Sequence, residues 1–131
     1  MGKALFIEQL KALDYEYREP FPGLIVIDYT IDVGKFIGRK VELGFYKLDG
    51  FPDIPPGGPI FSTTLMPFNN SVNTHPNGGI HHIFTVFPEM ANAPGFGPEW
   101  QYWSRPCNGW ATTEKTIETY FSHLRHLLDT L

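Results

Sequence analysis

The sequence predicts an α+β domain: a four-stranded antiparallel meander flanked by an N-terminal and a C-terminal helix. Apolar residues recur at three- and four-residue steps near both ends of the chain, and β-branched or alternating runs lie between them. The short connections between successive runs favour antiparallel pairing. The 131 residues are 42% hydrophobic and 18% charged, which suits one core and not two. We therefore expect a single domain over residues 1–131.

The first helix is expected over residues 3–17. Its apolar positions follow a helical period and comprise Leu5, Phe6, Leu10, Leu13 and Tyr17. Pro20 and Pro22 cannot continue a helix, so we place its end before them.

Four strands are expected at 24–31, 35–48, 60–66 and 80–87. The first is a β-branched run, and the second alternates, with Val41, Leu43 and Phe45 on one face. The stretch 51–59 contains too many prolines to donate the hydrogen bonds of a central strand, so we interpret it as an extended loop.

The C-terminal helix is expected over residues 112–131, capped by Thr112 or Thr113. Before it lies an irregular segment, and we expect Trp100, Trp103 and Trp110 to anchor this segment in the core rather than to stack on a ligand. The predicted core comprises Val41, Leu43, Phe45, Leu124 and Leu128.

The composition limits which kinds of partner and which cellular compartment can be expected. The net charge is -4, and no run of basic residues exceeds the pair Arg39 and Lys40, so no nucleic-acid partner is expected. No apolar stretch reaches the length of a membrane span, and we recognise no secretory leader or lipidation signal. The single cysteine, Cys107, permits no internal disulfide. We expect a cytoplasmic protein with a free thiol and no membrane partner.

Three local patterns occur in the order found in ubiquitin-conjugating (UBC) enzymes. Phe-Pro-Asp-Ile-Pro-Pro at 51–56 precedes the expected third strand, His-Pro-Asn stands at 75–77, and Trp-Ser-Arg-Pro at 103–106 precedes the last helix. Together they resemble the UBC family, and the segment 100–105 with Trp110 is most similar to its prokaryotic members.

The resemblance implies a UBC-like fold and a role in a bacterial ubiquitin-like modifier pathway. A conjugating enzyme of this kind would receive a ubiquitin-like protein from a ThiF-like activating enzyme as a cysteine thioester and transfer it to an amine. Metal-dependent deconjugating peptidases accompany such families, and antiviral defence is one setting. No cofactor is expected.

The resemblance also has departures at the catalytic positions. His81 stands where the family carries its nucleophilic cysteine, so only Cys107 can form a thioester. Its loop setting beside Arg105 favours a thiolate, although a lone cysteine is also commonly a small core residue. Asn77 would stabilise the oxyanion and His75 would be structural; in the absence of the resemblance, Asn77 before a glycine is a turn residue.

Two further interpretations remain open. A UBC-like adaptor without catalytic activity would bind the modifier or the activating enzyme, and an unrelated ligand pocket is a third possibility. Zinc binding by His75, His81, His82 and Cys107 is disfavoured by their spacing, so no metal is expected. On the first helix, Lys3, Lys11 and Arg18 are the candidate contacts to the activating enzyme.

Overall fold

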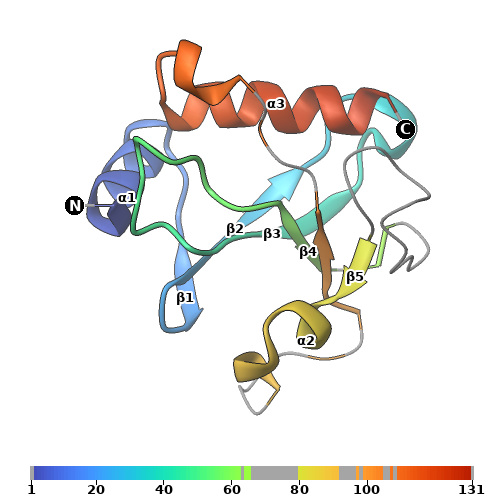
Figure 1. The fold of residues 1–131 in the computed structure, drawn as a ribbon. Coiled ribbons are helices and arrows are strands. Elements are labelled where there is room, and N and C mark those ends of the chain that lie inside the picture. Colours follow the sequence, from blue (N-terminus) through green and yellow to red (C-terminus); the bar gives the residue numbers. More distant parts are fainter. Residues whose placement is uncertain are drawn as a thin grey trace.

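The computed structural model describes residues 2–62, 64–65, 80–91, 97, 99–104, 107 and 109–130. These residues form an α+β structure in which three α-helices surround a six-stranded antiparallel sheet (Figure 1). The strand order is β1-β2-β3-β4-β6-β5.

The strands are β1 Arg18–Phe21, β2 Leu24–Thr30, β3 Lys40–Phe45, β4 Ile60–Ser62, β5 Ile80–His82 and β6 Gln101–Trp103. The α-helices are α1 Gly2–Ala12, α2 Ile83–Val86 and α3 Ile117–Asp129. Short 3-10 turns lie at η1 Gly34–Phe36, η2 Pro88–Met90 and η3 Trp110–Thr112.

Helices α1 and α3 cover one face of the sheet, and the main core lies beneath them (Figure 1). Phe6 and Leu10 of α1 and Leu124 and Leu128 of α3 are each at most 1% exposed. The predicted core residues Val41, Leu43, Phe45, Leu124 and Leu128 are all buried there, which confirms that expectation. A side chain also ties the two helices together, because the Ile117 backbone N–H at the start of α3 donates to Gln9 Oε1 of α1 at 2.8 Å.

A second, smaller core lies on the opposite face, under α2 and η2 (Figure 1). In β2, Leu24 and Val26 are buried on this face, whereas Asp28 and Thr30 further along the strand are exposed. Tyr46 is likewise buried here. This part of the outer face is therefore covered, although the alternation of apolar and polar residues along 40–46 is typical of a strand with one exposed face. One end of this outer face is covered and the other end is open.

The predicted four-stranded meander is wrong in its number of strands and in its last pairing. The first three expected strands pair in order as β2, β3 and β4, but β4 then pairs with β6, which separates it from β5. The expected fourth strand stops at His82, whose Nδ1 accepts a hydrogen bond from the Phe84 N–H and begins α2. Strand β1 was missed because of its proline, which an edge strand tolerates.

Both terminal helices are shorter than expected. Helix α1 ends at Ala12, and Asp14 follows with a positive φ of 65°. Helix α3 begins at Ile117, so the expected cap at Thr112 or Thr113 is wrong; the Thr116 hydroxyl accepts from the Thr119 N–H instead. Among the described helices, none has the length and apolar character needed to span a bilayer.

Candidate functional site

The proline-rich loop, residues 51–59, is fixed against β6, η3 and α3. The Trp110 indole N–H donates to Pro52 O at 2.8 Å, and the Tyr120 hydroxyl donates to Gly57 O at 2.7 Å. The Gly58 N–H donates to the Tyr102 hydroxyl at 3.3 Å. Three aromatic side chains therefore satisfy backbone groups that the loop's own prolines cannot pair.

Glycine is required where this loop approaches β6 most closely. A Cβ atom on Gly58 would collide with the Trp103 carbonyl oxygen. Within β6, the buried side-chain Oε1 of Gln101 accepts from the Leu65 N–H at 3.1 Å and from the Trp103 indole N–H at 3.3 Å. Trp100, Trp103 and Trp110 are each at most 4% exposed, which confirms that they anchor the segment.

Cys107 lies between β6 and η3, partly buried, and packs against the main core. Burial raises the pKa of its thiol above the ordinary cysteine value, because the thiolate would lose hydration. This is opposite in direction to the lowered pKa that its neighbour Arg105 was expected to cause, and Arg105 itself lies outside the described residues. Cys107 is thus partly exposed as a residue, and burial favours the protonated form of its thiol.

Tyr120 of α3 is the buried phenol next to this thiol. Complete burial raises the pKa of Tyr120 far above its usual value, and the proximity of Cys107 and Tyr102 raises it further. Its hydroxyl remains a neutral donor to Gly57 O throughout the physiological range. Tyr120 thus lies near Cys107 and also donates a hydrogen bond to the proline-rich loop.

The histidine and asparagine candidates are distributed differently. His75 and Asn77 lie outside the described residues, so their distance from Cys107 is not defined by the structure. His81 is partly buried in β5, opposite Tyr102 of β6. Directly opposed residues share a sheet face, so His81 lies on the face of Tyr102, which packs on the smaller core.

The three basic residues proposed for partner binding lie along one end of the molecule. Lys3 on α1 pairs with Glu19 at 2.9 Å, and the Lys11 ammonium lies 5.9 Å from the Tyr17 ring centre. Arg18 belongs to β1 and not to the first helix, which corrects its expected position, and it bridges Asp28 at 3.3 Å and Glu42 at 3.0 Å. The pKa of Glu19 is lowered, first by the Gly23 N–H and then by Lys3.

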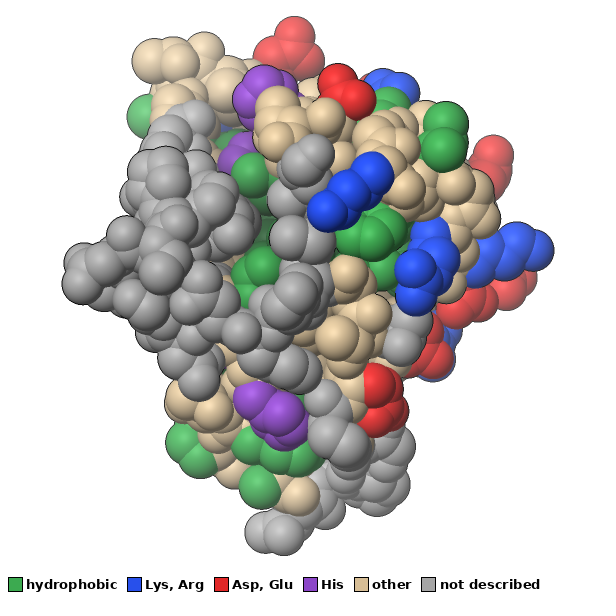
Figure 2. Space-filling model, turned by 90° about the vertical axis from the view of Figure 1, so that its right-hand side faces the viewer, with side chains coloured by type: hydrophobic (Ala, Val, Ile, Leu, Met, Phe, Trp, Pro, Cys, Tyr) green, Lys and Arg blue, Asp and Glu red, His purple; other side chains and the backbone are tan. Residues whose placement is uncertain are grey.

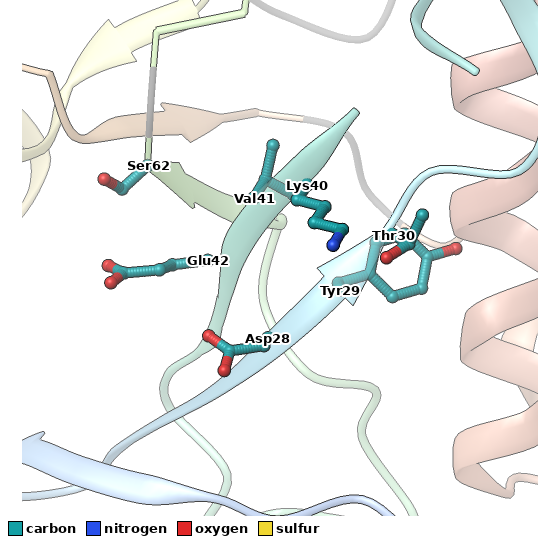
Figure 3. A pocket seen from close by; sticks show the side chains of 7 residues that line it. All are labelled: Asp28, Tyr29, Thr30, Lys40, Val41, Glu42 and Ser62. Carbon is teal, nitrogen blue, oxygen red and sulfur yellow. The ribbon is translucent and has the colours of Figure 1, made fainter. Parts of the chain in front are cut away.

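The open end of the outer sheet face holds a polar depression that the sequence analysis missed. Figure 3 shows the seven residues that line its volume of about 600 Å³, namely Asp28, Tyr29, Thr30, Lys40, Val41, Glu42 and Ser62. Alternate positions of β2 and β3 supply its polar side chains, a signal present in the sequence. Carboxylates, hydroxyls and an ammonium can bind a polar ligand, but they include no activated nucleophile.

Among the described residues, no three His, Cys, Asp or Glu side chains gather closely enough to hold a metal ion. No family model, no curated protein and no solved structure matches this chain. The resemblance to UBC enzymes therefore rests on the sequence motifs.

Proposed function

We propose that this chain is a UBC-like carrier of a ubiquitin-like modifier, loaded on Cys107 by a ThiF-like activating enzyme. The observation that carries the proposal is the partly exposed Cys107, which packs against the main core close to Tyr120 of α3. An N-terminal helix, an antiparallel sheet and a C-terminal helix also follow one another along the chain, which supports the proposal at the level of an α+β fold.

Loading is a transfer between two thiols. The Cys107 Sγ attacks the thioester carbonyl carbon on the activating enzyme, a new S–C bond forms, and the old S–C bond breaks. The proton released by Cys107 balances the proton taken up by the departing thiolate. An acceptor amine then attacks the same carbonyl, forms an amide, and returns the thiol to Cys107.

The raised pKa of Cys107 has two opposing effects on this reaction. It lowers the thiolate fraction at neutral pH, but it also makes the thiolate a stronger nucleophile, because nucleophilicity increases with basicity. A group on the activating enzyme that removes the proton would therefore determine when the carrier reacts, and the free carrier would resist adventitious oxidation.

The test is incubation of the chain with the cognate activating enzyme, modifier and ATP, followed by gels with and without reductant. We expect a reductant-sensitive adduct that is absent from Cys107→Ala. No adduct, while the activating enzyme itself becomes charged, would refute the carrier role.

A second candidate is a UBC-like adaptor without catalytic activity. Two observations favour it: burial raises the thiol pKa, and His81 occupies the position where the family carries its nucleophile. An adaptor would bind the modifier or the activating enzyme equally well as the wild type or as Cys107→Ala. Equal calorimetric binding of the modifier by both proteins, together with no reductant-sensitive adduct in the loading assay, is the result expected of an adaptor.

A further inference from the structure

The connection between β2 and β3 concentrates positive charge on an otherwise acidic chain. We define the basic loop as residues 33–40, which contain Lys35, Arg39 and Lys40 and no acidic residue. All 14 acidic residues of the chain lie outside it. On the face of the molecule drawn in Figure 2, several Lys and Arg side chains lie near one another, with Asp and Glu side chains beside them.

These three cations are exposed and lack carboxylate partners within the described part of the chain. Elsewhere, Lys3 pairs with Glu19, Arg18 with Asp28 and Glu42, and Arg125 with Asp32. By contrast, the Lys35 ammonium lies over the Phe36 ring, 5.4 Å from the ring centre. Asp32, which adjoins the loop, pairs with Arg125, and Asp28 and Glu42 line the sheet depression together with Lys40. Lys35 and Arg39 therefore form no ion pair with a described carboxylate and remain available to a partner.

Backbone hydrogen bonds hold the basic loop in one conformation. The Ile31 N–H donates to Arg39 O at 2.9 Å, and the Gly38 N–H donates to Ile31 O at 2.7 Å. Gly34 adopts a positive φ of 76° and packs so closely on α3 that a Cβ atom there would collide with the Leu128 carbonyl oxygen. A loop anchored in this way loses little entropy when a partner binds.

The basic loop also exposes an aliphatic side chain among its cations. Ile37 is 67% exposed, the most exposed large hydrophobic residue of the described chain. A single exposed aliphatic residue is ordinary on a protein surface. An exposed aliphatic residue on an anchored loop, two residues from Lys35 and two from Arg39, instead matches a ligand that carries both carboxylates and an apolar side chain.

We propose that the basic loop is a docking site for an acidic segment of a partner protein. An aliphatic side chain of the segment packs on Ile37, while its carboxylates pair with Lys35 and Arg39. A membrane fits less well, because one aliphatic side chain and three cations bind a bilayer weakly and the net charge of -4 opposes approach to anionic lipid. This site is independent of Cys107.

Lys40 lies where the basic loop meets the sheet depression, and the proposed site ends there. Lys40 and Thr30 line the same depression as Asp28 and Glu42 (Figure 3). The two carboxylates repel an acidic segment, so its negative side chains are confined to the loop end of the depression.

The test uses fluorescence anisotropy of the full chain with a labelled peptide of alternating Glu and Leu residues. We expect binding that weakens as salt increases, with no binding to the matching peptide of Gln and Leu. The double variant Lys35→Glu, Arg39→Glu should weaken binding about tenfold, since each exposed pair is lost and becomes repulsive. Ile37→Ser should weaken it a few-fold with all charges retained.

The control is Lys47→Glu, Lys115→Glu, which makes the same charge change away from the basic loop; circular dichroism establishes that each variant is folded. An equal loss of affinity in this control would overturn the proposal, because overall charge would then explain the binding. Absence of peptide binding, or tighter binding to phosphatidylserine–phosphatidylcholine vesicles or to a DNA duplex, would also overturn it.

Discussion

At the scale of single residues, hydroxyl and indole groups hold the proline-rich loop in place. The proline-rich loop has few amide donors of its own, and Trp110, Tyr102 and Tyr120 supply its missing hydrogen bonds. The loop and the tryptophan anchors were predicted separately from the sequence, and the hydrogen bond from Trp110 to Pro52 O joins them. Each partner is fixed by the other.

We predict that Tyr120→Phe destabilises the fold although it removes one atom. The change leaves the Gly57 carbonyl oxygen without its donor, and a lost buried hydrogen bond costs about 1–3 kcal/mol. Tyr17→Phe, at a residue 37% exposed, is the matched control and should change the free energy of unfolding by less than about 0.5 kcal/mol. Urea denaturation measures both, and equal effects would contradict the role given to Tyr120.

Alkaline pH should also destabilise the protein. Burial first, then Asp32, raises the pKa of Tyr29 to about 12, and burial first, then the hydrogen bond to Glu89, raises that of Tyr46 to about 12. Unfolded tyrosines lose their protons near pH 10, so above this pH the unfolded state binds fewer protons than the native state.

The free energy of unfolding should therefore hold below pH 10 and fall as pH rises toward 12. Urea unfolding at a series of alkaline pH values measures this fall. Tyr29→Phe should reduce its slope, and a free energy that stays constant across this window would contradict the raised pKa values.

At the scale of elements, local periodicity predicted the two terminal helices and β2, β3 and β4. The helices bury an apolar face with a helical period, β3 alternates, and β2 is a β-branched run that is buried on both faces at its start. Strand β6 was not predictable in this way, since its three residues include a buried glutamine and no distinguishing period. The end of β5 depends on one side chain, His82, which begins α2.

Of the candidate site, too, only part could be predicted from the sequence. Cys107 could be named as a candidate from the sequence because it is the only cysteine and a thioester requires a thiol. The roles of Tyr120 and Gly58 could not, because each depends on a contact between segments distant in the chain. The raised pKa of Cys107 is likewise a property of packing, which the adjacent sequence letters do not reveal.

A pair of glycines tests how the basic loop is anchored. Gly34 and Gly38 both have positive φ, at 76° and 87°, but only Gly34 packs against α3; a Cβ atom on Gly38 would meet nothing within 4 Å. Gly38→Ala should cost about 1 kcal/mol for the backbone conformation alone.

Gly34→Ala should cost more, about 2 kcal/mol or above, because the backbone of α3 must also move. Thermal unfolding of both variants measures the difference. Equal midpoints would mean that the loop does not depend on its contact with Leu128.

At the scale of the whole molecule, the charged surfaces are separated by function in our account. Lys3 and Lys11 on α1 are assigned to the activating enzyme, the basic loop to an acidic segment, and Cys107 to the modifier. These surfaces share no residue, so each can be altered and tested separately. For the charged surfaces, long-range charge complementarity affects association rate more than affinity.

Reversing the charge of α1 should slow loading of Cys107. For Lys3→Glu, Lys11→Glu we expect a several-fold lower association rate at low salt and a smaller difference at high salt, because salt screens exposed charges. Lys115→Glu is the control and should load at the wild-type rate. Wild-type loading by the double variant at low salt would remove α1 from the interface.

The central claim is that Cys107 carries the modifier, and the most direct measurement is the chemical location of the adduct. The chain is charged by its activating enzyme, modifier and ATP, quenched in acid to preserve thioesters, digested, and analysed by mass spectrometry. We predict that the C-terminal residue of the modifier is attached to the peptide containing Cys107 and is released by hydroxylamine. Attachment only to a lysine, or an unmodified Cys107 peptide from a reaction in which the activating enzyme is charged, would contradict the claim.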